Sequence, residues 1–592
     1  MRTTPWDEET YRQTLLKTYP GFAFTFITQG NALFGGFSRD STDLNDIYFH
    51  DKQHRLTVCT DALIINRSEL FEKLNLTEDP SINSARLMCL AYQTWGKDFI
   101  SHIDGDFAIT IWDQAQNQFF AFRDRVGVRP LYLHTLEHGI ACATYHGTLI
   151  PLLSVLEQDP IYVRNLVAGI FCWGTPYYTG TLYQGIDVVK PAHFLEWTSN
   201  RLTQTRYWDL RNNPMSGVPT LKEALEKFSE LLHASVRKYV GAHDKIALEV
   251  SGGLDSGSVA CLARAYFPDK PMQAFSNQFP ENLPKDKEAL KLKDEFPYAK
   301  ALCEQLNIPL KGILPADFST EEAYSALVQW LKGAFRHRFP LQHYPYYQQA
   351  KAFGSKVIFS GHGGDEYVSS RSYEMLWELK KSGQWLRYGY EMTRGFTISK
   401  TWQAIKHRLF KKDERGFKDK ALRQNDALLR SCFPADWVDF IHQNQRSWDL
   451  IRSAKEREWD YYEGRYSSGM QGRLESSYLV GQFYGVYYCY PLLDAQLLQY
   501  YHHLPSTYKR RHGRGRYLFY LALKPFFPKK HLEINTKRIV TPSAIPPIDF
   551  LESNQPTCEN WPEQLKKFKI QAENTQRLLQ LSVSKTKGVH LR

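Results

Sequence analysis

Several features are missing from this chain of 592 residues, and each absence removes a class of protein. Its nine cysteines are scattered from Cys59 to Cys558 without a Cys-x-x-Cys pair, so we expect reduced, mostly buried thiols rather than a disulfide scaffold. The longest wholly apolar run, at residues 166–173, is too short to span a membrane. No apolar signal core occurs near Met1, and we therefore expect a cytoplasmic protein with no membrane span.

The chain also lacks a strong charge imbalance. Lys and Arg number 74 against 63 Asp and Glu, which leaves a formal net charge of +11. A positive excess of this size is compatible with a polyphosphate or acidic partner. It is smaller than the dense basic stripe of a nucleic-acid-binding protein, so no nucleic-acid partner is expected. The basic segment at residues 406–423 is interpreted as a solvated helix face or loop, with a docking site for an acidic peptide as the alternative.

The length predicts two or more domains. Residues 1–210 are rich in short strand-like segments separated by turn residues, and residues 211–220 have the composition of a linker. From residue 221 to residue 592, an amphipathic helix precedes alternating strands and helices, which predicts a doubly wound parallel sheet. The expected local elements are strands at 21–28, 32–37, 55–59, 107–112, 118–122 and 272–279, and helices that open at 61–70 and cover 221–240.

The strongest motif is Ser-Gly-Gly-Leu-Asp-Ser-Gly-Ser at residues 251–258, between an apolar strand-like run and an apolar helix-like run. Its two glycines let backbone N–H groups face inward, and the following helix offers its positive N-terminal end to an anion. No Gly-Lys-Ser/Thr follows, so it is not a Walker A loop. The motif resembles the pyrophosphate loop of ATP-pyrophosphatases that make AMP intermediates. An ordinary strand-to-helix turn is the alternative.

A second glycine turn, Ser-Gly-His-Gly-Gly-Asp-Glu at residues 360–366, follows another short apolar run. In a doubly wound sheet both turns converge at the carboxyl ends of the strands. Asp255 and Asp365 can then bind Mg²⁺, which needs few carboxylates when phosphate oxygens complete its shell, although Asp365 and Glu366 alone would suit a helix start. The predicted ATP-binding residues are Val250, Ser251, Gly252, Gly253, Leu254, Asp255, Ser256, Ser276, Asn277, Ser360 and Gly361.

Both halves of the chain resemble asparagine synthetases. Gly-x-Phe-Ala and Trp-Asp within residues 105–113, and Arg-Asp-x-x-Gly-x-x-Pro-Leu-Tyr at residues 123–132, follow the pattern of that family's glutaminase domain. Tyr-Pro-Leu-Leu-Asp at residues 490–494 and Gly-Arg-Tyr-Leu at residues 515–518 are similar to its C-terminal pattern. The resemblance implies an α+β glutaminase-like domain of the Ntn type, a β-sandwich with helices, followed by an α/β ATP-pyrophosphatase domain with a helical C-terminal part.

One departure concerns the nitrogen source. The family's glutaminase uses a cysteine exposed as the processed N-terminal residue, whose thiol is the nucleophile. Here Arg2 follows Met1, and the first cysteine is Cys59. We therefore expect an inactive glutaminase domain, retained as a scaffold or as a surface for a partner, and an amine donor other than glutamine.

A second departure lies at the predicted catalytic residues. The third residue of the 360–366 turn is Glu in asparagine synthetases and Tyr in β-lactam synthetases, whereas His362 resembles the Gly-His-Gly-Gly-Asp turn of lasso-peptide cyclases. Its imidazole can take a proton from an attacking amine, or it can be a turn histidine bonded to the backbone. Arg516 stands where both synthetases place a lysine, and it can contact the oxyanion and the α-phosphate. Lys537 is a substitute for that charge, or either residue is a surface cation; Glu366 completes the predicted set.

The leading hypothesis is an ATP- and Mg²⁺-dependent lasso-peptide cyclase. It would activate an Asp or Glu side chain of a precursor core peptide and join it to the peptide's own N-terminal amine, with a leader-binding protein and a leader peptidase as further partners. The alternative is a ligase like asparagine or β-lactam synthetase that uses ammonia or a small amine. A peptide-binding scaffold is disfavoured by the two intact phosphate turns, and a tRNA-modifying enzyme by the N-terminal domain.

Overall fold

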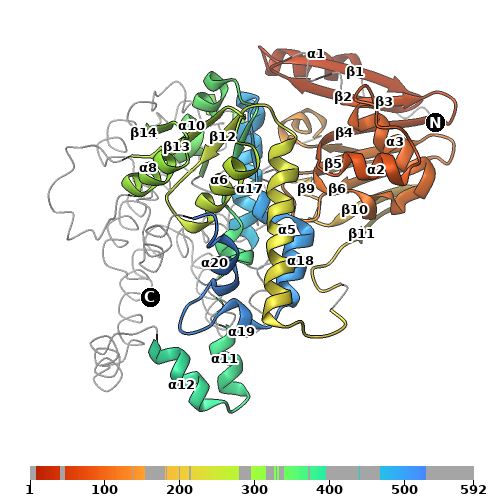
Figure 1. Cartoon of the computed structure of the whole chain (residues 1–592). Coiled ribbons are helices and arrows are strands. Elements are labelled where there is room, and N and C mark those ends of the chain that lie inside the picture. Colours follow the sequence, from red (N-terminus) through yellow and green to blue (C-terminus); the bar gives the residue numbers. More distant parts are fainter. Residues whose placement is uncertain are drawn as a thin grey trace.

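The structure is a computed structural model of the whole chain (Figure 1). It describes residues 8–153, 181–278, 295–314, 326–331, 339–394, 439 and 467–527, apart from gaps at 41–43, 45–46, 138, 182, 199–200, 213–214, 328–329, 371 and 373. Lys537 and the basic segment 406–423 lie outside the described residues. None of the helices within these ranges is both long and apolar enough to cross a bilayer.

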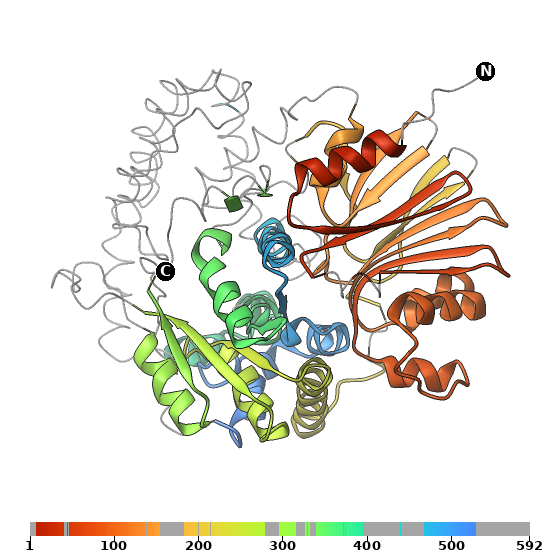
Figure 2. The same ribbon diagram turned by 90° about the horizontal axis from the view of Figure 1, so that it is seen from above.

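The N-terminal domain is built on a six-stranded antiparallel sheet in the order β11-β10-β6-β5-β4-β3. One face of the sheet packs on helices α2 and α3, and the other packs on strand β7 and its neighbours. Successive residues of β5 therefore alternate between two cores. Phe107 and Ile109 point toward the helices, and Ala108 points away from them. This confirms the predicted sandwich with helices (Figure 2). The elements of the six-stranded sheet and its helices are β3 Tyr48–Asp51, β4 Leu56–Ile64, α2 Arg67–Lys73, α3 Ser84–Trp95, β5 Gly105–Asp113, β6 Gln118–Arg123, β10 His193–Thr198 and β11 Arg201–Arg206.

The described part of this domain also contains two smaller sheets, a β1-β2 hairpin and a three-stranded sheet in the order β8-β7-β9. The hairpin places Phe22 and Phe37 against Trp330 of the second domain, with the Phe22 and Trp330 rings stacked at 4.8 Å between centroids. The other α-helix and the strands described here are α1 Glu8–Thr18, β1 Ala23–Gln29, β2 Ala32–Ser38, β7 Tyr132–Leu136, β8 Gly139–Ala143 and β9 Ile186–Val188. Three 3-10 helices are η2 Gly96–His102, η3 His146–Thr148 and η4 Ile150–Leu152.

The helix predicted to open at residues 61–70 is wrong in its first half. Strand β4 continues to Ile64, and α2 begins only at Arg67. The strand continues because Leu63 and Ile64 pair with Asp106 and Gly105 of β5. Pairing with a neighbouring strand overrides the local helical preference of these residues.

The second domain contains a five-stranded sheet whose neighbouring strands are all parallel, in the order β14-β13-β12-β15-β16. The predicted doubly wound sheet is therefore confirmed. The strand order reverses at β12, so the crevice beyond its carboxyl end is where such sheets bind ligands. The strands are β12 Ile246–Glu249, β13 Met272–Asn277, β14 Leu310–Ile313, β15 Val357–Phe359 and β16 Tyr487–Cys489.

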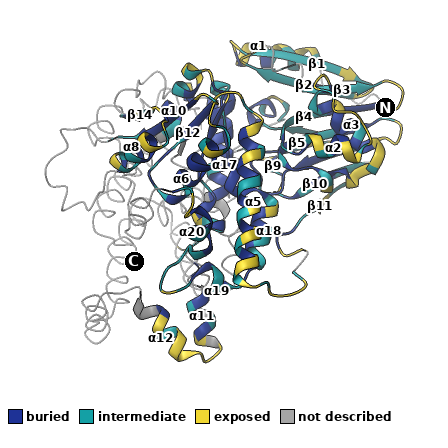
Figure 3. Ribbon diagram, viewed as in Figure 1, coloured by how far each residue is buried: buried dark blue, intermediate teal, exposed yellow. Residues whose placement is uncertain are grey.

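Helices cover this sheet, and α5 and α17 are among those that face the N-terminal domain (Figures 1 and 2). Helix α5 begins with a capping box between Thr220 and Glu223 and buries Phe228 and Leu232, which leaves one exposed face (Figure 3). The helices and short turns are α5 Leu221–Gly241, α6 Leu254–Tyr266, α8 Phe296–Gln305, α10 Phe339–Phe353, η6 Gly364–Val368, α11 Glu374–Lys381, α12 Trp385–Arg394, α17 Ser467–Tyr484, η7 Pro491–Leu493, α18 Ala495–His503, α19 Ser506–Lys509 and α20 Tyr517–Leu523.

Candidate active site

The first glycine turn joins the central strand β12 to helix α6. Gly252 has φ +72°, and a Cβ there would lie 2.7 Å from the backbone nitrogen of Ala299, so only glycine fits. The Ser251 N–H donates to Ser256 Oγ at 3.0 Å, and Gly253 N–H donates to Ser251 Oγ at 3.3 Å. The turn thus presents hydroxyls and backbone at the N-terminus of α6, where the helix dipole favours an anion.

The second glycine turn packs directly against the first. A Cβ on Gly361 would lie 2.2 Å from the Ser256 nitrogen, and one on Gly364 would lie 2.6 Å from Asp255 Cγ. The turns approach this closely because both positions lack a side chain, with Gly361 against backbone and Gly364 against the Asp255 side chain. The structure therefore brings together, at one edge of the sheet, the two turns that were predicted to converge.

Two carboxylates meet at this contact, and Arg516 joins them. Its Nη1 lies 3.3 Å from Asp255 Oδ2, and its Nη2 is in contact with Asp365 Oδ1. Asp255 also accepts a hydrogen bond from Ser369 Oγ. Asp255 is largely buried, whereas the Asp365 side chain is 60% exposed, so the pair opens toward solvent on the Asp365 side.

Ser276 and Asn277 end strand β13, beside the first turn. Ser276 is buried, and its backbone carries the parallel ladder to β14. The side-chain oxygen of Asn277 is buried and has no hydrogen-bond partner among the described residues. A buried acceptor of this kind is expected to find a donor, and the amino group of a nucleotide base, when bound, would supply one.

His362 and Glu366 lie on the buried side of the second turn. Nδ1 of His362 is 3.8 Å from Glu366 Oε1, and its ring meets that of Tyr490 edge-on at 5.8 Å between centroids. Glu366 Oε2 accepts the Gly363 N–H at 3.1 Å, as a first-turn acid does. Burial raises the pKa of the Glu366 carboxyl above its usual value, which favours its protonated form.

Glu249, His343 and Arg473 form a buried charged cluster next to the two turns, and the sequence analysis did not predict it. Glu249, the last residue of β12, lies 3.3 Å from His343 Nε2 and 3.5 Å from Arg473 Nη2. Burial raises the pKa of Glu249, but hydrogen bonds from His343 and Ser360 and the Arg473 charge outweigh it and lower the pKa to about 2. An acid inside the apolar run 246–250 was a visible signal that a cationic partner is needed, because buried carboxylates are almost always paired.

These residues fit ATP and Mg²⁺. The glycine turns and the α6 N-terminus suit phosphates, the orphaned Asn277 oxygen suits a base amino group, and Asp255 with Asp365 suits a hard cation. Among the described residues, no three Asp, Glu, His or Cys side chains cluster to enclose a metal ion. A Mg²⁺ held by two carboxylates would take its other ligands from phosphate and water.

Cysteine chemistry is not supported in the described part of the N-terminal domain. Burial raises the pKa of Cys59, Cys89 and Cys142 to about 12. At neutral pH these thiols are protonated, and a thiol is a weak nucleophile compared with its thiolate.

The fold and the paired turns define an N-terminal sandwich domain joined to a parallel α/β domain built to hold phosphates. Residues 227–558 match the family model described as "Asparagine synthase", and residues 40–208 match that of a "Glutamine amidotransferase domain". The first match covers more than half of the chain, and the chain therefore belongs to the asparagine synthase family.

Curated relatives are similar over parts of the chain. Asparagine synthetase [glutamine-hydrolyzing] 3 of Bacillus subtilis is 25% identical over 280 residues, which is 47% of this chain and 40% of that protein. The amidase chry2 of Gibberella zeae is 27% identical over 219 residues, 36% of this chain and 31% of its own. The chain spans less than half of the length of each of these two relatives.

Solved structures give weaker similarity. The glutamine phosphoribosylpyrophosphate amidotransferase of B. subtilis, complexed with ADP and GMP, has a TM-score of 0.24 and 10% identity, covering 51% of this chain and 77% of that one. A glutamine-dependent NAD⁺ synthetase from Acinetobacter baumannii has a TM-score of 0.16 and 12% identity, with 51% and 74% coverage. Scores this low add nothing to the family assignment.

Proposed function

We propose that this chain is an ATP-dependent, AMP-forming carbon–nitrogen ligase. The observation that carries the proposal is the close packing of the two glycine turns, which sets Asp255, Asp365 and Arg516 at the N-terminus of α6. Membership of the asparagine synthase family supports it. A peptide-binding scaffold without catalysis has no use for this arrangement of acidic and glycine residues.

In the proposed first step, a substrate carboxylate oxygen attacks the α-phosphorus of ATP. A new acyl–O–P bond forms while the bond to pyrophosphate breaks. The turn at residues 251–256 and the positive N-terminal end of α6 would hold the departing phosphates. Asp255 and Asp365 would hold Mg²⁺, which would neutralise charge on the phosphates, and the nearby Arg516 guanidinium adds a second positive charge.

In the second step, an amine attacks the activated acyl carbon and AMP leaves. The attacking ammonium must lose a proton, and His362 is the candidate base because its ring lies in the turn that carries Asp365. Glu366, which contacts the imidazole, then orients it. Lys537 remains a predicted further cation of this step.

We further propose that the substrate is a peptide, and that the product is a macrolactam of the lasso-peptide type. Support comes from the resemblance of the Gly-His-Gly-Gly-Asp turn to that of lasso-peptide cyclases. A core peptide would supply both carboxylate and amine. A leader-binding protein and a leader peptidase remain expected partners.

The test incubates the full chain with ATP, Mg²⁺ and linear peptides that carry a free N-terminus and a single Asp or Glu at successive positions. We expect AMP formation and a peptide product lighter by one water. An N-acetylated copy of each peptide is the matched control, because it retains the carboxylate but cannot close the ring.

Aspartate with ammonium tests the alternative, a small-substrate ligase, which the names of the similar asparagine synthetases favour. Formation of asparagine, with no peptide product, would replace the macrolactam proposal by that alternative. Absence of AMP with every substrate, in a folded protein, would contradict the ligase proposal itself.

A further inference from the structure

Helix α17 lies between the two domains and contacts both (Figures 1 and 2). Side chains at three- and four-residue spacing face the N-terminal domain. Gln471 donates to the Val126 carbonyl at 2.7 Å, Glu475 accepts from Tyr132, Tyr478 donates to Asp61, and Gln482 donates to Thr144 at 3.4 Å. This spacing places all four on one side of the helix.

The same helix supports the ATP turns from its other side. Arg473 lies 3.5 Å from Glu249, the residue that precedes the first turn, and its charge also acts on Glu366 of the second turn. The Ser477 carbonyl accepts a hydrogen bond of 2.8 Å from Tyr347 of α10. A shift of α17 would therefore move the Arg473 guanidinium, which interacts with acidic residues at both glycine turns.

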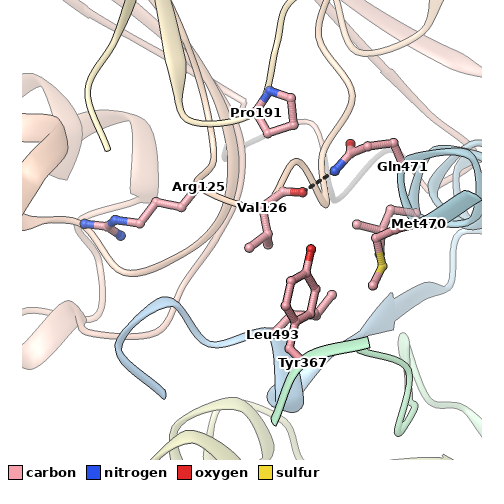
Figure 4. Close-up of a pocket in the computed structure, with 8 residues that line it drawn as sticks. Arg125, Val126, Pro191, Tyr367, Met470, Gln471 and Leu493 are labelled. Atoms are coloured by element: carbon pink, nitrogen blue, oxygen red, sulfur yellow. Dashed lines mark hydrogen bonds between the residues drawn. The ribbon is translucent and has the colours of Figure 1, made fainter. Parts of the chain in front are cut away.

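Gln471 lies two positions before Arg473 on α17, and both ends of its side-chain amide have partners in the N-terminal domain. Its Nε2 donates to the Val126 carbonyl (Figure 4). Its Oε1 lies 3.3 Å from Arg123 Nη2. Gly127 has φ +74°, and a Cβ there would lie 2.7 Å from Gln471 Oε1. Asp124 shapes this part of the N-terminal domain by accepting the N–H groups of residues 126–129 at 2.5–3.1 Å.

The residue after the second glycine turn faces the same boundary. Tyr367, which follows Asp365 and Glu366, lines a small cavity together with Val126, Pro191 and Gln471 (Figure 4). Residues of the N-terminal domain and of the acidic turn therefore line one cavity.

We infer that the amidotransferase-like domain positions the ligase site, with Gln471 and Arg473 as positioning residues on α17. The domain would then have a structural role that does not depend on glutaminase activity. The inference rests on the proposed function only in taking residues 251–256 as the ATP loop; the mechanical link itself depends on neither ATP nor peptide.

The test compares Gln471→Ala with Gln482→Ala in the full chain. Both glutamines lie on α17, face the N-terminal domain and are 8% exposed, but Gln482 is far along the helix from Arg473. Hydrogen exchange of backbone amides in residues 246–258 is measured together with global unfolding in denaturant. We expect about five- to tenfold faster exchange in Gln471→Ala, as for the net loss of one buried hydrogen bond, and wild-type exchange in Gln482→Ala.

Equal exchange in the two variants, or a loss of protection spread evenly over the whole chain, would overturn the inference. Gln471→Glu is a milder second variant in case the alanine variant does not fold. It keeps an acceptor for Arg123 but loses the donor to Val126, so the same local effect is expected.

ATP binding is measured separately by calorimetry without peptide. Weaker binding is expected in Gln471→Ala and unchanged binding in Gln482→Ala. If the wild-type chain bound no ATP, the proposed function would fail, while the exchange comparison would still decide whether the N-terminal domain positions the turns.

Discussion

The Arg516 side chain stands between two carboxylates that would otherwise repel each other. Asp255 is largely buried, so its charge needs a partner, and the planar guanidinium can contact Asp255 and Asp365 at once. A lysine has one ammonium group and does not offer this fork. Arginine at this position therefore suits a site in which a side chain balances the acidic pair and then contacts phosphate.

His362 provides a test that separates activation of the carboxylate from attack by the amine. His362→Ala is expected to leave substrate-dependent ATP–pyrophosphate exchange largely intact but to slow ring closure by about 10²–10⁴, the usual contribution of a general base. A peptide N-terminus has a pKa of about 8, so higher pH should partly rescue the rate. The measurement is exchange and cyclisation over a pH series, with His233→Ala as a control, because His233 is bound to Tyr266 away from the turns.

Parallel loss of exchange and cyclisation, without rescue at high pH, would instead assign His362 to the shape of the turn. Its contacts with Tyr490 and Glu366 are those that such a structural role would use.

At the scale of elements, helix α12 is hydrogen-bonded to the turn at residues 511–514, which directly precedes Arg516. Both carboxylate oxygens of the buried Glu391 accept backbone N–H groups, from His512 at 3.1 Å and from Gly513 at 2.7 Å. These two residues have φ values of +55° and +74°, the left-handed pair of a tight hairpin turn that Arg511 and Arg514 close. Arg516, at φ +59°, then starts α20.

We expect Glu391→Gln to reduce pyrophosphate release by about tenfold, because an amide accepts only one of the two N–H groups and leaves the other unpaired. The double variant with Arg516→Ala should be no slower than Arg516→Ala alone, since residues that act as a unit are not additive. Glu378→Gln is the matched control; Glu378 binds Ser506 on the neighbouring α19, not this turn. Additive losses would mean that Glu391 does not act through Arg516.

The elements that the sequence could predict are those specified locally. The turns at Gly252 and Gly361 follow buried strands and need glycine at those positions, so the strands, turns and parallel sheet were recognisable. The end of β4 was not, because it depends on pairing of Ile64 with β5. Likewise Arg473 lies more than 200 positions from Glu249, and no periodicity connects such distant residues.

At the scale of the whole molecule, the boundary between the domains contains buried charge. Tyr239 of α5 donates to Asp106 Oδ1 of β5 at 3.0 Å, and Gln496 of α18 donates to Asp104 at 2.8 Å. Arg129 lies over the rings of Tyr478 and Tyr487, with centroid distances of 5.0 and 4.8 Å. Charges held at such a boundary make the fit of the two domains sensitive to protonation.

Asp106 determines whether stability rises or falls with pH at this boundary. Burial, and then the neighbouring Asp124 charge, raise its pKa to about 7, although Arg129 and Tyr239 act in the opposite sense and Asp494 adds to the rise. A carboxyl whose folded pKa exceeds its unfolded value of 3.8 stabilises the fold at low pH. That contribution is lost as the pH rises from about 4 through about 7.

We therefore expect Asp106→Asn to raise the free energy of unfolding relative to wild type at about pH 8 and to lose that advantage at about pH 5, where the wild-type carboxyl is protonated. The asparagine oxygen can still accept the Tyr239 hydroxyl, so the contact between β5 and α5 persists. Denaturant unfolding across this pH range measures the difference. Asp113→Asn is the control. Asp113 lies at the other end of β5, bonded to Gln116 and away from α5, so this variant removes a carboxylate that does not contact the second domain. A pH-independent difference between Asp106→Asn and wild type would mean that Asp106 is ionised throughout, and that Arg129 and Tyr239 outweigh its burial.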